Sequence, residues 1–458
     1  MIEAQDQWRQ GQVARNVHLR HTMSLRQFSD IILYIAAFLC LFRGTQMAFA
    51  LPTAQDEFVV GRRIYPVIQL YALMALSMGY IILNPREIMA AVRQAGFLLS
   101  IFMLLIAVSV VASVDVGASS IGLFATLAMT LPPFFFYWRF GGLKSLEMLR
   151  VFSVFTIAVN LIYAVTFPHY AFMSGSLAGD MRGLFPHKNW FGSFISLAFV
   201  ILVPTPGEKP FTRPWIAVRS FFTLLALYCL FAAHSSTAII QTAIGMVAVF
   251  GADMLRKMPI GAARSAAIVA TFFGICATAL FGGMIAMSEV AAGMGKDLTF
   301  SGRSFIWEAL AAHLLDKPFT GYGFGTMRIP AYITPMMVNV PFSVNSSHNT
   351  YLELLLSIGI PATILWILFS LGRLHGKIAQ SAASRIEAAM LNRQAALILM
   401  VLIGSGSEAQ RMLAPSSTWP VMLFAMPIWT MWRASQERAG QPQSPPDRNG
   451  RWTREPAR

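Results

Sequence analysis

Apolar residues dominate long windows of this chain, and polar residues collect in the intervals between them. Each window is about 18–22 residues long, which is enough for a helix to cross a bilayer hydrocarbon core of about 30 Å. The pattern predicts about twelve helical spans, at residues 28–50, 64–83, 95–114, 117–138, 148–168, 189–204, 215–233, 236–254, 264–287, 347–371, 394–407 and 415–432.

The windows predict an all-α, polytopic integral membrane protein. We divide it into a cytoplasmic N-terminal segment (1–27), a group of N-terminal transmembrane helices (28–168), a core (169–432) and a disordered cytoplasmic tail (433–458). The core contains the longest polar interval, a loop at about 288–346 that we place on the outer side of the membrane. The tail is rich in Gln, Pro, Ser and Arg, a composition that does not support a packed core.

Composition agrees with this assignment, because 56% of the residues are hydrophobic and only 12% are charged. The net charge of +14 is compatible with nucleic-acid binding, but its distribution indicates a membrane topology instead. When alternate loops are assigned to the cytoplasm, starting from the N-terminus, 24 of the 35 basic residues lie on that side. This is the positive-inside asymmetry. It places both termini in the cytoplasm and requires no nucleic-acid partner.

The large loop contains a second, shorter pattern. Apolar residues recur at helical spacing from Phe305 to Leu314, and Pro318 ends the repeat. This predicts an amphipathic helix of about 13 residues, too short to span a membrane and suited to its surface. Arg303 falls in the first turn of this helix. The alternating glycines at 321–325 predict a tight turn that brings the backbone close to another element.

Cationic side chains gather on the outer side of the predicted membrane. Arg182 and Lys188 lie in one outer loop and Arg303 in another, and they could converge with Arg411. The chain has no P-loop and no D-x-D motif, so a diphosphate would be held without Mg²⁺, by guanidinium groups that match phosphate oxygens in pairs. We therefore expect a site with no metal and no cofactor.

At the start of the span near 347, His348, Asn349, Tyr351 and Glu353 are concentrated where an apolar helix meets water. Ionisable groups are costly at this depth and are usually functional. A neutral imidazole can accept a proton near neutral pH. We interpret Glu353, one turn beyond Asn349, as a residue that orients its neighbours.

Three segments resemble the O-antigen ligase and bacterial polysaccharide polymerase superfamily. They are RGLFPHKNWFG at 182–192, the block Gly302-Arg303-Ser304-Phe305-Ile306-Trp307 with its downstream glycine turn, and His348-Asn349-x-Tyr351-Leu352-Glu353 with Gly359 further on. The resemblance covers about residues 180–375, the core domain of that family.

The resemblance implies a metal-independent glycosyltransferase in the bacterial inner membrane, with its active site on the periplasmic side. The donor would be an oligosaccharide on undecaprenyl diphosphate, and the acceptor a polysaccharide or a lipid A core sugar. Membrane lipids, and a flippase and chain-length regulator of the same pathway, are the implied partners. His348 would be the catalytic base. The diphosphate would be bound by Arg303, Arg182 and Lys188, and the supporting residues would be Asn349, Tyr351, Glu353, Gly302, Trp307 and His234.

One position departs from the family pattern. The family has Ser-Arg or Ser-Lys before the span that begins near 236, whereas this chain has His234-Ser235-Ser236-Thr237. His234 could replace the missing basic residue, or Arg182 and Lys188 could suffice. We expect an exopolysaccharide or O-antigen polymerase, with O-antigen ligase as the alternative.

Two other classes remain open. A secondary transporter would fit twelve spans, although the chain shows no internal repeat. A related transferase could instead use acids of the first outer loop, Asp56 and Glu57. The residues do not define the transferred sugar or its anomeric configuration.

Overall fold

A computed structural model of the chain describes residues 24–47, 64–93, 96–205, 213–259, 261–263, 266–267, 270, 303–340, 346–380, 382–409, 412–416 and 418–426. Regular structure in these residues is helical, apart from one isolated antiparallel bridge between Phe172 and Met181. The prediction of an all-α protein is therefore confirmed for the part of the chain that the structure describes.

The longer helices correspond to the apolar windows. They are α2 (Leu25–Thr45), α3 (Ile64–Leu83), α5 (Gly96–Val111), α6 (Val116–Thr166), α8 (Lys188–Leu202), α9 (Arg213–Ala232), α10 (Ser236–Lys257), α15 (Thr350–Ala379) and α16 (Arg385–Gly404). The shorter elements are α4 (Pro85–Arg93), α7 (Pro168–Ala171), η2 (Gly175–Leu177), α13 (Arg303–Ala311), η4 (Thr326–Arg328), α14 (Pro330–Ile333), η5 (Thr334–Met337) and α17 (Thr418–Ala425).

Six of the described helices are long and apolar enough to cross a membrane, and three more are apolar but shorter. Many large apolar side chains on the outer faces of these helices are exposed, among them Ile82, Leu104, Leu224 and Phe231. Soluble monomers rarely expose apolar surface on this scale. The helices and this surface together indicate a multi-pass membrane protein.

The number and boundaries of the helices differ in part from the prediction. The windows at 117–138 and 148–168 belong to one element, α6, which bends at Gly141, where φ is 81°. The window at 264–287 lies almost entirely outside the described residues, and the last window is described only as far as Met426. Twelve spans therefore remain a prediction.

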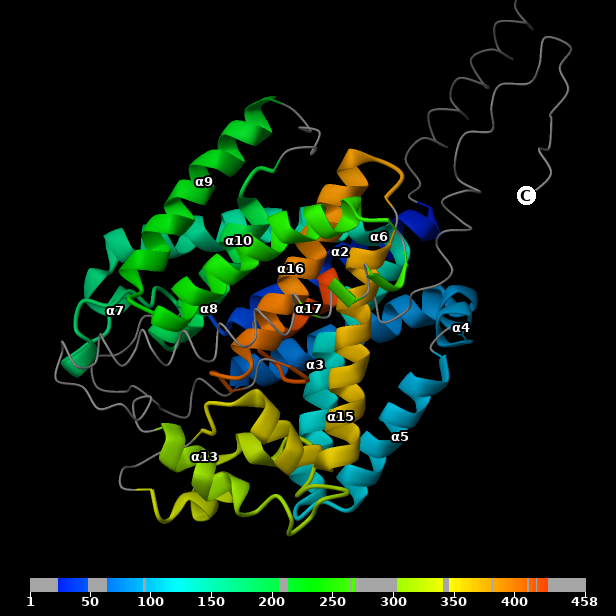
Figure 1. Cartoon of the computed structure of the whole chain (residues 1–458), viewed down its shortest axis with the longest axis vertical. Coiled ribbons are helices and arrows are strands. Elements are labelled where there is room, and N and C mark those ends of the chain that lie inside the picture. Colours follow the sequence, from blue (N-terminus) through cyan, green and yellow to red (C-terminus); the bar gives the residue numbers. More distant parts are fainter. Residues whose placement is uncertain are drawn as a thin grey trace, which may run out of the picture.

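The central helix of the bundle is α16, which packs against α8, α10, α15 and α17. Figure 1 shows it in orange, running between these neighbours through the middle of the molecule. Nearly all of its side chains from Leu391 to Leu402 are buried. A helix that is apolar all round is stable only where other elements cover every face, which is the position of α16.

Two arginines anchor the far end of α8. Arg393 of α16, which is fully buried, donates to the carbonyls of Ile201 and Val203 at 2.9 and 2.7 Å. Arg219 of α9 donates to the carbonyl of Leu202 at 3.2 Å. Cations are favourable at a helix C-terminus, where carbonyl groups lack intrahelical partners. These contacts hold the axis of α8 and so determine where its N-terminus lies.

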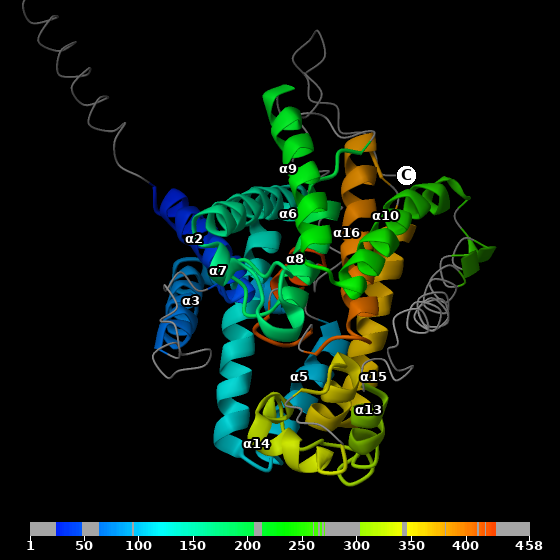
Figure 2. The same cartoon turned by 90° about the vertical axis from the view of Figure 1, so that its left-hand side faces the viewer.

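Elements of the large loop form a small separate layer at one end of the molecule. Figures 1 and 2 both place α13 and α14 there, beside the ends of α5 and α15. The layer has its own apolar cluster, formed by Ile306, Leu310, Met327, Ile333, Met337, Leu352 and Leu356. Two of these residues, Leu352 and Leu356, belong to the first turns of α15, so the layer covers the beginning of that helix.

The amphipathic helix is shorter than expected. It begins at Arg303 as the sequence indicates but ends at Ala311, after nine residues. Beyond it, the Asp316 carboxylate contacts the His313 ring at 2.9 Å and accepts from the Tyr322 hydroxyl at 2.8 Å. Such side-chain contacts favour a turn over continued helix. The buried side of α13 packs on protein, with Ile306 and Leu310 covered by α15 and η5.

A glycine turn holds the bend in α15. Gly359, with φ of 78°, interrupts that helix, and the freed backbone groups near it pair with the loop at 318–325. The N–H of Tyr322 donates to the carbonyl of Leu356 at 2.7 Å, and the N–H of Ile360 donates to the carbonyl of Pro318 at 2.7 Å. A side chain at Gly321, where φ is 65°, would meet the carbonyl of Leu356 at 2.5 Å. The predicted close approach of this turn is confirmed.

Candidate functional site

Three segments distant in the chain meet at the carboxylate of Glu408, in the turn after α16. Arg303 Nη2 lies 3.1 Å from Oε1, and Asn189 Nδ2 lies 3.5 Å from the same oxygen. His348 Nδ1 lies 3.9 Å from Oε2. Glu408 is only 7% exposed. A buried carboxylate needs compensating charge and hydrogen bonds, and these residues supply them.

Arg303 is placed by its position as the first residue of α13. Its Nη1 also donates to the carbonyl of Ser407, so two nitrogens of one guanidinium hold consecutive residues of the turn. One helical turn later, Trp307 Nε1 donates to the carbonyl of Ser347 at 3.1 Å. The helix therefore links the Glu408 turn to the segment that carries His348. Gly302 lies outside the described residues.

His348 precedes α15 in a strained conformation. Its φ is 48°, in the left-handed region, which costs about 1–2 kcal/mol for a residue with a Cβ. Asn349 is the N-cap of α15, and its Oδ1 accepts from the N–H of Leu352 at 3.1 Å. Thr350 Oγ1 donates to the carbonyl of Glu408 at 2.7 Å. The cap and this contact hold the imidazole beside Glu408.

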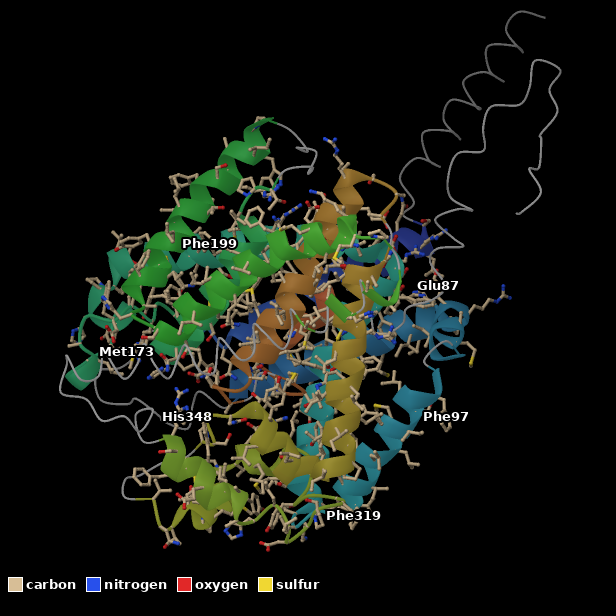
Figure 3. The ribbon with its side chains drawn as sticks, in the orientation of Figure 1. Glu87, Phe97, Met173, Phe199, Phe319 and His348 are labelled. Carbon is tan, nitrogen blue, oxygen red and sulfur yellow. The ribbon has the colours of Figure 1, made fainter. Side chains whose placement is uncertain are left out.

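The ring of His348 is accessible on one side. The side chain is 36% exposed, whereas Nδ1 is buried and has no hydrogen-bond partner among the described residues. Figure 3 places His348 at the junction between the α13–α14 layer and the helical bundle. The buried nitrogen faces Glu408, and the rest of the ring is open to a substrate.

A second carboxylate, Asp180, joins two further predicted residues. Lys188 Nζ forms an ion pair with Oδ2, and His234 Nδ1 lies 2.8 Å from Oδ1. Lys188 Nζ also donates to the carbonyl of His234 at 3.3 Å. Like His348, His234 has a left-handed backbone, with φ of 44°. Residues from the outer segments at 169–188 and 234–237 thus share one acid.

Among the described residues, Arg182 forms no ion pair with Glu408 or Asp180. Its Nε donates to the carbonyl of Tyr170 at 3.1 Å, and within the described ranges it forms no ion pair. The next residue, Gly183, has φ of 57° and lies against Asn160, whose Oδ1 accepts from the N–H of Leu184 at 2.7 Å. The RGLF segment is therefore fixed by backbone contacts to α6 and α7.

His187 lies at the N-terminus of α8, next to Lys188. It is the N-cap of α8, and its Nδ1 accepts from the N–H of Asn189 at 3.2 Å. Burial lowers the pKa of His187, the charges of Lys188, His348 and Arg182 lower it further, and Glu408 acts in the opposite direction. The ring therefore lies in the electrostatic field of Glu408, Lys188, His348 and Arg182.

The two remaining predicted residues, Tyr351 and Glu353, contact neighbouring elements of the fold. The hydroxyl of Tyr351 donates to the carbonyl of Leu402 in α16 at 2.6 Å. Glu353 Oε1 accepts from Arg328 Nε at 2.7 Å. Both contacts fasten the first turns of α15 to neighbouring elements, and so they support the residues at its N-terminus.

The sequence analysis did not identify Glu408, Asp180 or Arg328. A signal was present for Glu408, which is the acid in the polar interval Ser405–Glu408 between two apolar windows. An acid at the edge of a span is costly and calls for a partner. Asp180 precedes the RGLF segment by two residues but was treated as an isolated aspartate. The acids at 56 and 57 and Arg411 lie outside the described residues.

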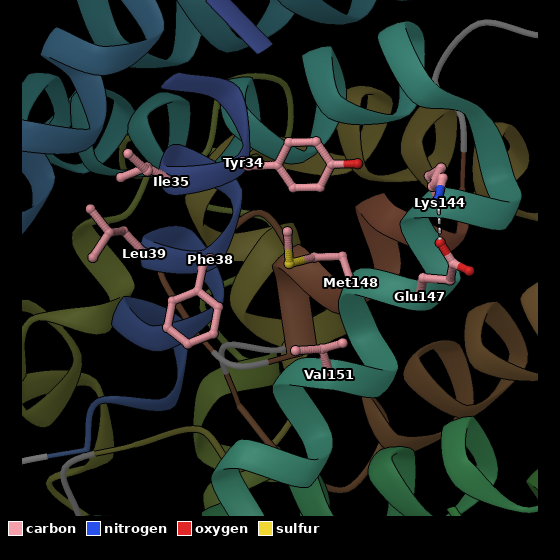
Figure 4. A pocket seen from close by; sticks show the side chains of 8 residues that line it. All are labelled: Tyr34, Ile35, Phe38, Leu39, Lys144, Glu147, Met148 and Val151. Carbon is pink, nitrogen blue, oxygen red and sulfur yellow. Dashed lines mark ion pairs between the residues drawn. The ribbon is translucent and has the colours of Figure 1, made fainter. Parts of the chain in front are cut away.

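Two further features of the described residues are relevant to ligand binding. No three His, Cys, Asp or Glu side chains in this part of the chain are grouped closely enough to hold a metal ion. A groove of about 570 Å³ lies between α2 and the second half of α6 (Figure 4), and Glu408 is not among the residues that line it. Its walls are mainly apolar, and the ion pair between Lys144 and Glu147, at 3.0 Å, lies at its edge.

Comparison with known proteins gives two matches. A family model described as O-antigen ligase matches residues 221–367, which include His234, Arg303 and His348. The exopolysaccharide production protein ExoQ of Rhizobium meliloti (strain 1021) is 28% identical over 226 residues, which cover 45% of this chain. The match spans about half the length of that relative, 49%. This part of the chain is therefore similar to the O-antigen ligase and polysaccharide polymerase-like family.

Proposed function

We propose that this protein is a periplasm-facing glycosyltransferase that polymerises undecaprenyl-diphosphate-linked repeat units into exopolysaccharide or O-antigen. The proposal rests on one observation, which is that Asn189, Arg303 and His348 all lie beside the carboxylate of Glu408. Each of these residues comes from a different one of the three family-like segments. A base and a fixed cation at one point are what a transfer from a diphosphate donor needs.

In the proposed reaction the acceptor hydroxyl oxygen attacks the anomeric carbon of the donor sugar. The bond between that carbon and the phosphate oxygen breaks, and its electron pair leaves with undecaprenyl diphosphate. The hydroxyl proton passes to Nε2 of His348. Nδ1, which faces Glu408 at 3.9 Å, carries the other proton. The carboxylate then stabilises the imidazolium that forms.

The donor diphosphate would be held by Arg303, Lys188 and Arg182. Arg303 donates from Nη1 to Ser407 and from Nη2 to Glu408. A guanidinium has five N–H donors, so the other donors remain available for phosphate oxygens. Lys188 and His234 share Asp180, which fixes both at the N-terminal end of α8. This arrangement supports His234 as the replacement for the basic residue that the family pattern has at this place.

The topology and partners belong to the same proposal. The distribution of basic residues supports an inner-membrane protein with both termini in the cytoplasm. Charge compensation by arginine and lysine, rather than by paired aspartates and Mg²⁺, supports a reaction without metal. A lipid-linked donor also requires that a flippase delivers it, and a chain-length regulator of the pathway is the second expected partner.

An O-antigen ligase is the alternative within this family, and the description of the matching family model favours it. The name of the Rhizobium meliloti relative favours a polymer-forming role. The two reactions share donor and base and differ in the acceptor, which is a lipid-linked glycan in one case and a lipid A core sugar in the other.

The surface polysaccharide of a deletion strain separates these functions. A polymerase defect leaves single repeat units on the surface, and a ligase defect leaves full-length polymer on undecaprenyl diphosphate. Unchanged polysaccharide, in both length and attachment, would exclude both. Complementation with the wild-type chain and with His348→Ala then assigns any defect to this site.

A further inference from the structure

His187 is an unusual N-cap. Helices usually begin with Ser, Thr, Asp or Asn, whose side-chain oxygen accepts a backbone hydrogen bond. Here a ring nitrogen performs this task, because Nδ1 of His187 accepts from the N–H of Asn189 at 3.2 Å. The backbone of His187 is extended, with φ of −149° and ψ of 149°, as a capping residue requires.

This contact determines the tautomer of the ring. A backbone N–H can only donate, so Nδ1 must present a lone pair to it. A neutral imidazole has one protonated nitrogen, and that nitrogen is therefore Nε2. Protonation of Nδ1 would place two N–H groups against each other and break the cap. Burial, which lowers the pKa of His187, keeps the ring in the neutral form.

The Nε2–H of His187 is therefore a fixed, neutral donor. In the part of the chain described, no residue accepts a hydrogen bond from it. The charged groups that act on the ring are Glu408, from the turn after α16, His348, from the segment before α15, and Lys188 and Arg182, from its own loop and helix. Two of these are the cations expected to hold the donor diphosphate.

We propose that His187 is a substrate-binding residue that donates from Nε2–H to a non-bridging oxygen of the donor diphosphate. The inference rests on the proposed function and adds a ligand to it. The N-terminus of α8, which carries Lys188 and a partial positive charge, favours an anion at the same place. A neutral donor adds a hydrogen bond there without further repulsion among Lys188, Arg182 and Arg303.

Three substitutions separate the hydrogen-bond donor of the ring from its role as the N-cap. In His187→Asn the side-chain oxygen can replace Nδ1 as the capping acceptor, but nothing reaches the position of Nε2. In His187→Gln the amide nitrogen can approach the position of Nε2, while the cap is weakened. His187→Ser is a second variant that keeps a good cap and has no donor at that reach.

The test measures binding of undecaprenyl diphosphate to the purified full-length chain, by the shift in its melting temperature in detergent. Inorganic pyrophosphate and phosphatidylglycerol are measured in parallel, to separate the diphosphate group from the lipid. We expect His187→Asn and His187→Ser to melt without ligand as the wild type does and to bind undecaprenyl diphosphate about tenfold more weakly. His187→Gln should melt lower but bind within about threefold of the wild type.

Each contrary result has a distinct meaning. Wild-type affinity in both His187→Asn and His187→Ser would show that the ring serves only as a cap, and would leave the proposed function intact. If inorganic pyrophosphate does not compete with undecaprenyl diphosphate, the protein recognises the lipid and not the diphosphate group. This result would also overturn the role of His187. A wild-type chain that does not bind undecaprenyl diphosphate at all would instead overturn the proposed function, and this inference with it.

Discussion

Arg328 Nε lies 2.7 Å from Glu353 Oε1, and the two side chains are only 10% and 3% exposed. Arg328 belongs to η4 of the outer layer, and Glu353 belongs to the first turn of α15. Arg328 Nη2 also donates to the carbonyl of Leu413, in the segment before α17. This one ion pair therefore joins the outer layer to the helix that begins beside His348.

We predict that Glu353→Ala destabilises the protein much more than it alters the chemistry of the site. Removing one partner of a buried ion pair leaves a charge uncompensated and typically costs about 3–5 kcal/mol. The melting temperature of the purified protein measures this loss. Glu308→Ala, at an exposed acid of α13, is the matched control and should melt as the wild type does. A stable but inactive Glu353→Ala protein would instead assign Glu353 to the reaction.

For His348, we predict that replacement by Ala abolishes polymer formation but leaves folding and donor binding intact. Loss of a general base typically lowers the rate by about 10²–10⁴-fold. His348→Gln keeps hydrogen bonding without basicity and should be no more active than His348→Ala. Robust synthesis by a correctly inserted His348→Ala protein would exclude this residue as the base.

Arg303→Lys should be nearly as damaging as Arg303→Ala. The guanidinium holds Ser407 and Glu408 through two nitrogens, and a lysine ammonium cannot reproduce a planar fork. The expected loss in kcat/KM is about a hundredfold, or about 2.7 kcal/mol. If Arg303→Lys keeps most of the activity, the residue provides only a general positive potential.

Stability should depend on pH through His187. Burial lowers its pKa below the ordinary value of 6.5 in the folded protein, so the unfolded chain binds the proton more readily. The stabilising contribution is therefore complete above the unfolded value and is lost as pH falls below it. We predict a smaller drop in melting temperature from about pH 7.5 to about pH 5.5 for His187→Asn than for the wild type. An equal drop in both proteins would show that other groups cause the pH dependence.

Turnover by the purified enzyme should survive EDTA. The sequence has no D-x-D motif, and its outer side carries arginine and lysine where a metal-dependent transferase needs paired acids. The assay compares polymer formation before and after chelation. Loss of activity with EDTA, restored by a divalent cation, would promote Asp56 and Glu57 as candidates for the chemistry.

Local patterns in the sequence were sufficient for much of the helical framework. The predicted start of the helix at Ser236 agrees with the structure, because a switch from polar to apolar residues is a local signal. The glycines at 321–325 were interpreted correctly for the same reason, since a positive φ is a property of single residues. The length of α13 was wrong because Asp316 makes contacts that end the helix, and the pattern does not contain them.

The sequence by itself indicated which segments are apolar enough to span a membrane, how the basic residues are distributed along the chain and which three segments carry the candidate site residues. Only the tertiary structure decided that these segments meet at Glu408, which is 219 residues from Asn189 and 105 from Arg303. Hydrophobic periodicity is read within a few turns, whereas an ion pair needs two side chains within about 4 Å. The bends at Gly141 and Gly359, and the packing around α16, set those distances. The partner of a candidate site residue is therefore a property of the packed molecule.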